Sequence, residues 1–379
     1  MKRLLLLFVL PLMTTAVLAQ SSSNNSSSGF DGTVSKLAGD AAKGFVQPVV
    51  TGFGADLNGG WFHKAPTAEM YGFDFEFGVV AMGSFISDND RTFSASSAFQ
   101  FSGGYYSGDA LDNPSGEKSQ AELIAENIPN WYNPLTPHQQ IIDKIAATQF
   151  QVGISGPTIV GSKSDTMKVT IPGQDINLGN NQTYHINDNT QTLDGVTGVL
   201  DGASTVPLAA PQLSIGTLVG TQLTFRWLPQ IDAGSDIGKI KYFGFGIQHN
   251  PGLWFANPLP VDVAVSFFTQ DLKIGSIFET KTTAFGINAS KRFGPGAINI
   301  TPYAGFMIES SKMTVTYAYT YTVNPNLPPV SDQISFELEG ANKTRLTLGV
   351  SIKLLFLNIN ADYNLGSQNS ATAGLMFII

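Results

Sequence analysis

Apolar and polar residues alternate along much of the chain from residue 53 onward. Phe73, Phe75 and Phe77 alternate with Asp74 and Glu76. A period of two places alternate side chains on opposite faces of a β-strand. The same pattern recurs in the segments 222–227, 243–248, 298–309, 313–323, 346–354 and 357–365. The chain is therefore predicted to be all-β, with strands that have one apolar face and one largely wet face.

The alternating segments are long. Strands in soluble domains usually have about 5 to 6 residues, whereas about 9 to 11 tilted residues cross a bilayer. The predicted strands are 53–63, 70–83, 92–103, 148–155, 212–227, 240–249, 261–269, 277–291, 297–309, 312–323, 343–354, 357–365 and 371–379, with 333–340 as one more. The alternative for 53–63 is that it belongs to an N-terminal hatch instead of the sheet. Because bacterial single-chain barrels have even strand numbers, we predict about 14 strands, with about 12 or 16 as alternatives. The phase slips by one residue at Leu355 and Phe356, which predicts a tight hairpin turn there.

Two long insertions interrupt the strands, at residues 104–148 and 157–211. The first holds a weak helical segment at 121–128 and a better one with Ile141, Ile142 and Ile145 on one face. The second is polar and is predicted to hold a small hairpin. Insertions of this size are uncommon in compact structures unless they are functional or exposed.

The residues before the first predicted strand differ from the rest. Residues 1–19 contain Lys2 and Arg3, an apolar run and a small-residue cleavage site, the three parts of a secretory signal peptide. Residues 20–32 are predicted to form a flexible leader. Residues 33–52 are predicted to form a short helical segment, either a periplasmic tether or a hatch in the mouth of a barrel formed by residues 53–379. The apolar hatch candidates for a ligand site are Phe45, Val49, Val50 and Phe53.

The composition decides between two kinds of β protein. Only 13% of the residues are charged, whereas 39 are Gly and 26 are Phe, so charge does not solvate much of the surface. A soluble β-sandwich also alternates, but it needs charged residues on its outer face. No run after the signal reaches the roughly 18 apolar residues of a spanning helix. We therefore predict a transmembrane antiparallel β-barrel.

Several classes of site are not expected. The net charge of −8 argues against a nucleic-acid partner. The chain has no cysteine, so neither lipidation at Gln20 nor a disulfide framework is available. No enzyme is expected, because the sequence has four histidines and neither a nucleophile-elbow motif nor a His-Glu-x-x-His pair. The carboxylates at 88–90 and 188–189 lack calcium-loop spacing, so neither a metal nor another cofactor is expected.

Charges on the predicted inner strand faces are the candidate site residues. These are Asp74, Glu76, Arg226, Glu309, Lys353 and Asp362. An Arg or Lys facing lipid near the midplane costs about 2 to 4 kcal/mol, so these charges are expected in the lumen. There they either brace the barrel as ion pairs or line a substrate path. Aromatic residues are expected at the membrane interfaces, among them Trp61, Trp131, Trp227 and Trp254.

The pattern over residues 33–379 resembles the outer-membrane superfamily typified by the long-chain fatty acid transporter. The shared features are export, a small helical segment before the first strand and about 14 long strands. The segments 54–61, 225–229 and 246–250 are similar to an uncharacterised group of outer-membrane proteins with similar barrels. The strand 371–379 resembles the signal of the barrel-assembly machinery, which the resemblance implies as a folding partner beside outer-membrane lipid.

The resemblance implies a function at the Gram-negative cell outer membrane. The first hypothesis is passive transport of a small hydrophobic ligand through a barrel partly closed by the N-terminal segment. The alternative is a non-transporting barrel that displays its inserted loops for docking in secretion, adhesion or envelope assembly, since loops on rigid scaffolds often carry function. The content of the lumen separates them: a continuous apolar channel favours transport, and a plugged lumen favours docking.

Overall fold

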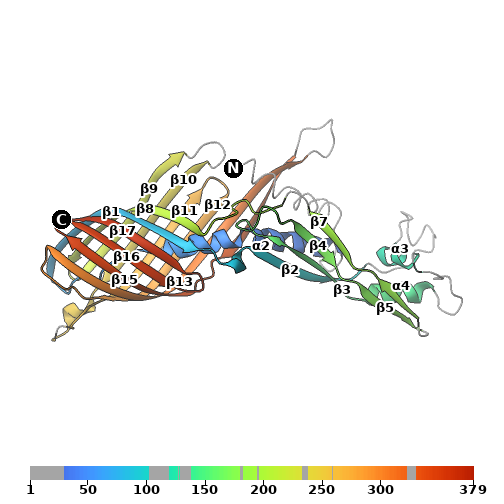
Figure 1. Ribbon diagram of the computed structural model, residues 1–379, viewed down its shortest axis with the longest axis horizontal. Coiled ribbons are helices and arrows are strands. Elements are labelled where there is room, and N and C mark those ends of the chain that lie inside the picture. Colours follow the sequence, from blue (N-terminus) through green and yellow to red (C-terminus); the bar gives the residue numbers. More distant parts are fainter. Residues whose placement is uncertain are drawn as a thin grey trace. The chain divides into compact units, whose positions relative to one another are not determined.

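The computed structural model describes residues 30–101, 119–126, 128, 138–179, 182–193, 196–232, 238–257, 259–321 and 330–379 (Figure 1). These residues divide into two compact units. The described part of the first unit comprises 47–88 and 202–379, and that of the second comprises 30–46 and 89–201. The predicted signal peptide and residues 20–29 of the predicted leader lie outside the described residues, whereas residues 30–32 of that leader begin a helix. Within the described part, no helix has the length and apolar character needed to cross a membrane.

The first unit is a closed antiparallel barrel. Its ring consists of β1 (Tyr71–Phe85), β8 (Thr205–Leu218), β9 (Thr221–Asp232), β10 (Lys239–His249), β11 (Asp262–Ile274), β12 (Phe278–Ser290), β13 (Ile298–Tyr321), β15 (Thr344–Leu354), β16 (Leu357–Leu365) and β17 (Ser370–Ile378). The ring closes because β1 pairs with both β8 and β17, and β12 pairs with β13. Strand β14 (Val330–Glu339) pairs with residues 312–321 of β13 and stands outside the ring.

The predicted count of about 14 strands is not confirmed. The described sheet has 11 strands, and without β14 the ring has ten. Segments 92–103 and 148–155 correspond to strands of the second unit, and 53–63 is not a strand. Segments 297–309 and 312–323 are one continuous strand of 24 residues, whereas 212–227 contains the turn between β8 and β9. The period of two predicts where most strands lie. It does not predict which strands pair or how many close the ring, because pairing is set by hydrogen bonds between distant segments.

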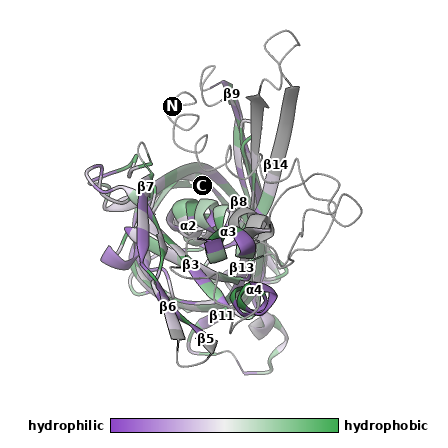
Figure 2. Ribbon diagram, turned by 90° about the vertical axis from the view of Figure 1, so that its right-hand side faces the viewer, coloured by the Kyte–Doolittle hydropathy of each residue, from purple (hydrophilic) through white to green (hydrophobic). Residues whose placement is uncertain are grey.

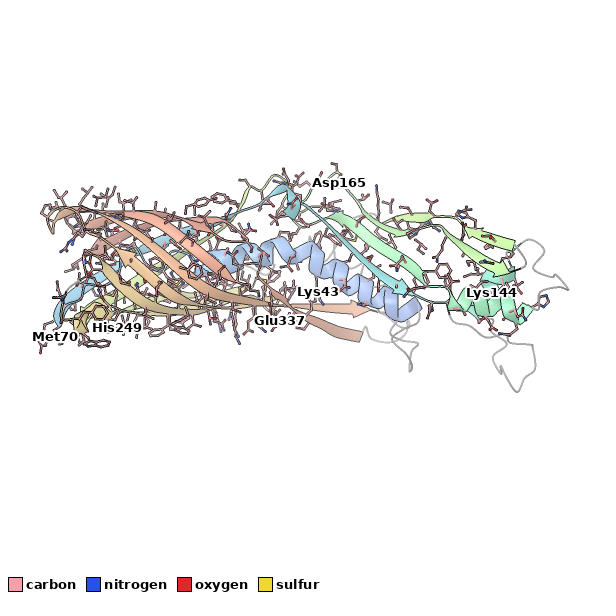
Figure 3. All side chains as sticks on the ribbon, turned by 90° about the horizontal axis from the view of Figure 1, so that it is seen from below. Lys43, Met70, Lys144, Asp165, His249 and Glu337 are labelled. Atoms are coloured by element: carbon pink, nitrogen blue, oxygen red, sulfur yellow. The ribbon has the colours of Figure 1, made fainter. Side chains whose placement is uncertain are left out.

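The two faces of the barrel wall follow the predicted alternation. On β1, Asp74 and Glu76 face inward, and Phe73 and Phe77 face outward at 76% and 45% exposure. The outward side chains of the ring are largely Phe, Ile, Leu and Val, and the inward ones are largely Gln, Asn, Ser and Thr. Figure 3 shows the outward side chains along the whole barrel wall. The prediction of one apolar and one polar face per strand is confirmed.

The two ends of the barrel differ. At the end where β1 begins, here named the turn end, β8 and β9 are joined by Val219 and Gly220, both with positive φ. Strands β15 and β16 are joined by Leu355 and Phe356, as predicted from the phase slip. This end also carries the short helix η2 (Pro251–Trp254). The opposite end is named the loop end, because there the chain leaves β1 at Phe85 and re-enters β8 after the second unit.

The second unit contains an open sheet in the order β2 (Thr92–Phe99), β3 (Phe150–Pro157), β4 (Met167–Ile171) and β7 (Asn189–Leu193). A hairpin of β5 (Gln174–Gly179) and β6 (Gln182–Ile186) and the helices α3 (Gln120–Glu126) and α4 (His138–Ala147) complete it. Ile141, Ile142 and Ile145 of α4 are buried, as their spacing predicted. The short helix η1 (Asp88–Asp90) precedes β2. The described part of 104–148 and residues 157–201 therefore belong to one folded unit. The predicted insertion 157–211 extends too far, because residues 205–211 form the first half of β8.

Helix α2 (Phe30–Asn58) has 29 residues and is longer than the predicted segment 33–52. Its residues to Val46 belong to the second unit, and those from Gln47 belong to the first. Figure 2 shows that it carries mostly hydrophobic residues. Residues 53–58 belong to this helix, whereas a strand over 53–63 is the first prediction from the sequence. That prediction is wrong, because this segment is buried inside the barrel, where a helix satisfies its own backbone groups.

Candidate functional site

The lumen of the barrel is filled by the chain itself. We name residues 47–65, the end of α2 and the loop after it, the plug. Leu57 of the plug is fully buried in a cluster with inward side chains of five strands. This cluster comprises Leu57, Val80, Met82, Ala210, Tyr242, Leu272 and Met376, with Phe53 packed against it. The barrel therefore has a packed apolar core at this level rather than an open channel.

A second core cluster surrounds Trp61, which is 1% exposed. Its ring stacks on Phe268 at a centroid distance of 5.1 Å. The Arg226 guanidinium forms a cation–π contact with the same ring, 4.2 Å from its centroid. Phe62 contacts Tyr303 edge to face at 6.0 Å. Gly244 leaves room for the indole, because a Cβ there would lie 2.8 Å from Trp61 Cη2. Trp61 is thus a plug residue, and its predicted place in an interfacial girdle is wrong.

Polar side chains of the wall hold the plug backbone. Arg226 Nη1 donates to the Gly59 carbonyl at 2.9 Å, and its Nε donates to Gln212 Oε1 at 2.8 Å. Gln270 Nε2 donates to the Leu57 carbonyl. Beyond the helix, the Ala65 N–H donates to Ser290 Oγ at 2.9 Å. Such bonds satisfy backbone groups that would otherwise be buried without partners.

Four charged or titratable side chains meet where the plug ends. Lys64 Nζ pairs with Asp74 Oδ2 and lies 2.5 Å from Glu76 Oε1, and His63 Nε2 lies 3.2 Å from Glu76 Oε2. Burial lowers the pKa of His63 to about 3, so this imidazole is neutral at physiological pH. Burial acts to lower the pKa of Lys64, but the Glu76 and Asp74 carboxylates outweigh it and raise that pKa. Lys64 therefore stays cationic and ties the plug to β1.

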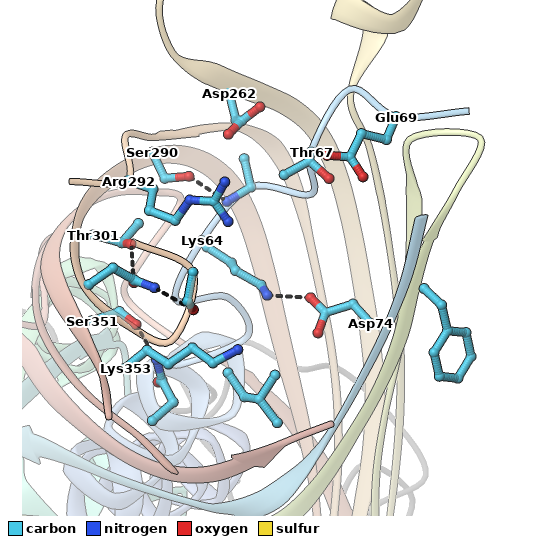
Figure 4. A pocket seen from close by; sticks show the side chains of 16 residues that line it. Lys64, Thr67, Glu69, Asp74, Asp262, Ser290, Arg292, Thr301, Ser351 and Lys353 are labelled. Carbon is cyan, nitrogen blue, oxygen red and sulfur yellow. Dashed lines mark hydrogen bonds and ion pairs between the residues drawn. The ribbon is translucent and has the colours of Figure 1, made fainter. Parts of the chain in front are cut away.

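A polar pocket of about 240 Å³ opens beside this cluster at the turn end. Figure 4 shows Lys64 reaching to Asp74, with Arg292 and Lys353 also lining the pocket. Its wall includes the acidic residues Glu69 and Asp262 and amide or hydroxyl side chains, so its charges nearly balance. Among the described residues, no group of three or more His, Asp or Glu side chains could hold a metal ion.

The remaining predicted charges brace the opposite wall. Glu309 Oε2 accepts from Arg345 Nε at 3.1 Å, with both side chains buried. Asp362 Oδ2 accepts from the Tyr303 hydroxyl at 2.9 Å. The six predicted site residues are thus all inward, but they form separate contacts: Asp74 with Glu76, Arg226 at the plug, Glu309 and Asp362 on the wall, and Lys353 at the pocket. No single cluster unites them.

The predicted hatch residues lie in both units. Phe45 belongs to the second unit, where its carbonyl accepts from the Ile159 N–H at 2.9 Å. Val50 is fully buried and Val49 is half-buried in the first unit, and Phe53 packs on the Leu57 cluster. Their role at a ligand site stays a prediction. Trp227 and Trp254 are 45% and 68% exposed, consistent with outward positions, and Trp131 lies outside the described residues.

Sequence reasoning missed Trp61, Lys64, Gln270 and Arg345 as functional positions. For Lys64, a signal was present: it precedes β1, whose inward face carries Asp74 and Glu76, two unmatched acids close in sequence. For Arg345, the inward phase of β15 would have placed the guanidinium beside other inward charges. For Gln270, no local signal existed, because its partner is a backbone carbonyl 213 residues away.

Comparison with known proteins places the chain in a family. The chain belongs to a family of unknown function (DUF6588), whose family model matches residues 1–379. A comparison with curated protein sequences finds no match.

Solved structures give only distant likenesses. A loop-deletion form of OmpT, an outer membrane protein of Vibrio cholerae, is 8% identical, covers 82% of this chain and 100% of its own, and has a TM-score of 0.22. The outer membrane channel DcaP of Acinetobacter baumannii is 10% identical, covers 83% of this chain and 100% of its own, and has a TM-score of 0.17. Likenesses at these TM-scores carry no argument about function. The resemblance to the fatty acid transporter superfamily is not confirmed.

Proposed function

We propose that this DUF6588 member is an outer-membrane barrel closed by its own N-terminal segment, and that it anchors the second unit for docking. The observation that carries the proposal is the plug: residues 47–65 fill the lumen with two packed clusters and backbone hydrogen bonds to the wall. A lumen packed like a protein core leaves no continuous path for a solute.

The outer wall supports membrane insertion. Large apolar side chains remain exposed on every strand of the ring, for example Phe285 at 55%, Leu348 at 52% and Leu375 at 47%. Soluble monomers rarely expose a contiguous apolar patch of more than a few hundred Å². A closed antiparallel barrel with this wall matches the architecture of outer-membrane barrels, in which every backbone group is paired and no edge faces lipid.

Passive transport of a small hydrophobic ligand is the other candidate, and it requires the plug to leave. The wall beneath the plug is lined mainly by Gln, Asn, Ser and Thr side chains, among them Gln212, Thr224 and Asn288. Burying these groups against an apolar solute would cost free energy, since they would lose hydrogen-bond partners. The plug's own apolar side chains occupy the apolar part of the lumen. Docking is therefore the better supported function.

The lengths of the connections between strands favour one orientation of the barrel in the outer membrane. Outer-membrane barrels have short periplasmic turns and longer extracellular loops. Short connections occur at both ends, such as 355–356 at the turn end and 275–277 at the loop end. The longest connection by far, residues 86–204 between β1 and β8, leaves the barrel at the loop end, and the longest at the turn end is 250–261. We therefore assign the turn end to the periplasm and the second unit's connections to the cell surface. A surface partner in adhesion or secretion would meet the second unit.

Closure is tested with a plug that can be locked in place. A Cβ at Gly54 would contact Ser311, so Gly54→Cys with Ser311→Cys joins the plug to β13 after a small adjustment. Liposome swelling with small sugars and uptake of a hydrophobic probe are measured under oxidising and reducing conditions. We expect no permeation by the native chain and no effect of oxidation. Uptake that stops on oxidation would establish a moving plug and overturn the docking proposal.

Surface display is tested by cysteine labelling, which is clean because the chain has no cysteine. Ser164→Cys places a thiol on an exposed position of the second unit, and Lys291→Cys places one at the turn end. We expect a membrane-impermeant maleimide to label the Ser164→Cys variant on intact cells, and the Lys291→Cys variant only after permeabilisation. The reverse pattern would refute the orientation.

A further inference from the structure

The outer wall carries lysines where its apolar band ends near the loop end. Strand β10 passes from Phe243 to Lys241, and β12 passes from Phe285 to Lys281, each within four residues on the same face. On β11, Lys273 follows Phe267 and Asp271 along the outward face. In a bilayer, an edge between apolar and charged outward residues lies at the headgroups.

The strand register sets like charges directly opposite one another. Lys241 pairs with Lys273 across β10 and β11, and Lys281 pairs with Lys312 across β12 and β13. Like charges directly opposite each other on one face destabilise a sheet. Glu279 offsets part of the repulsion between these lysines, because its Oε1 lies 3.0 Å from Lys273 Nζ and 3.2 Å from Lys281 Nζ.

Acidic residues lie beside most of these lysines: Asp232 is opposite Lys239 in the strand register, and Glu279 contacts both Lys273 and Lys281. Lys312 Nζ lies 2.9 Å from Glu337 Oε1. Lys241 forms no ion pair with any residue that the structure describes. With Lys239 on the same strand, the patch consists of Lys239, Lys241, Lys273, Lys281 and Lys312. An anion from outside the chain would therefore have Lys241 as its principal partner in this patch.

The lysines gather on one side of the ring. Near the loop end, the outward side chains of β15, β16, β17 and β1 include Leu346, Tyr363, Ala371 and Phe85, and none of these strands carries an outward lysine there. The exposed Lys343, which directly precedes β15, is paired with Glu339. A general interface with anionic lipid would spread lysines around the ring. Clustering on β10 to β13 indicates a local site.

A hollow in this patch has room for a headgroup. Its volume is about 350 Å³, and it is lined by Gly238, Lys239, Lys241, Lys273, Gly275, Ser276 and Ile277. Three lysines therefore converge on a shallow space next to the apolar band. Ammonium groups bind phosphate as compact point charges, and a lipid would add contact between its acyl chains and the neighbouring Phe243.

We propose that this lysine patch binds the phosphate of an anionic lipid headgroup in the leaflet at the loop end. The inference rests on the proposed membrane insertion, because only an inserted barrel presents the patch at headgroup level. Within that setting it adds a lipid partner and a site for it, on the outer wall of the barrel and apart from the plug.

The test uses the full chain reconstituted in phosphatidylcholine vesicles with and without phosphatidic acid. Lipid retained after mild extraction is counted by native mass spectrometry. Lys241→Gln with Lys273→Gln is expected to weaken phosphatidic acid retention about tenfold or more, since each lysine near a charged surface contributes to binding. Lys163→Gln with Lys168→Gln removes the same charge from exposed positions of the second unit and is expected to leave retention unchanged.

The outcomes are distinct. Equal retention by both double variants, with the protein floating with the vesicles, would overturn the lipid site. Failure of the native chain to float would overturn membrane insertion, and with it the proposed function. Loss of the bound lipid in millimolar inorganic phosphate would show a site for any phosphate and overturn the commitment to a lipid.

Discussion

The inner and outer faces of the barrel wall are built from the same strands but differ in composition: the outer face exposes apolar side chains, and the inner face buries polar and charged ones. The outer face exposes apolar side chains and carries few charges over its middle. The inner face buries charged groups such as Arg345 and Glu309 and pairs them, while apolar plug residues such as Leu57 and Trp61 fill the centre. The plugged barrel thus has a packed core like that of a soluble protein, enclosed by a wall whose apolar face points outward and whose polar face points inward.

The largest loss of stability is expected when a buried ion pair on the inner face of the wall is broken. Replacing Arg345 by Met leaves Glu309 buried without its partner, and breaking a buried pair from one side costs about 3 to 5 kcal/mol. The free energy of unfolding is measured by denaturant titration in detergent micelles. The control is Arg345→Met with Glu309→Leu, which removes both charges and should recover most of the loss. Equal instability of the single and double variants would refute the pairing.

The next largest loss of stability is expected for an Arg that faces lipid on the outer wall, compared with an Arg that faces water. Leu348, 52% exposed near the middle of β15, and Leu200, 43% exposed in the second unit, have similar exposure. Leu348→Arg should cost about 2 to 4 kcal/mol in a bilayer, whereas Leu200→Arg should cost less than about 0.5 kcal/mol. Unfolding from vesicles measures both. Equal small costs would contradict membrane contact at Leu348.

A smaller effect is expected where the plug meets the wall. The Cβ of Gly244→Ala would press on the Trp61 ring, and overpacking costs about 1 to 3 kcal/mol. Gly83 lies outward with nothing within 4 Å of its Cβ position, so Gly83→Ala is the matched control. Hydrogen exchange should rise in residues 47–58 for Gly244→Ala alone. Unchanged exchange in both variants would show that the plug does not depend on this contact.

The smallest effect concerns an exposed ion pair. Lys343 Nζ lies 2.6 Å from Glu339 Oε2, with both side chains more than half exposed. Solvent and salt screen such pairs. Lys343→Ala should therefore leave the unfolding midpoint unchanged within error, in contrast to Arg345→Met two residues further along the chain. A clear loss of stability would indicate that the rim of the barrel is less solvated than its exposure suggests.

Several features of the fold could be predicted from local patterns. The alternation on β1, the turn at Leu355–Phe356 and the buried face of α4 depend on residues within a few positions of each other, and all were confirmed. The inward position of all six charged candidates followed from the same period. The extent of α2 did not, because the alternating apolar and small residues at 53–58 suit a strand as well as a helix buried on all sides.

Local sequence patterns are enough to predict long two-faced strands, the charges that face inward and one tight turn, since side-chain direction along a strand is a local property. The tertiary structure alone decided that ten strands close the ring, that β2 and β3 join a separate sheet, and that Arg345 pairs with Glu309. It also decided that the lumen is filled, because packing of Trp61 against Phe268 depends on segments more than 200 residues apart. Such contacts arise from closure of the ring, which no local pattern encodes.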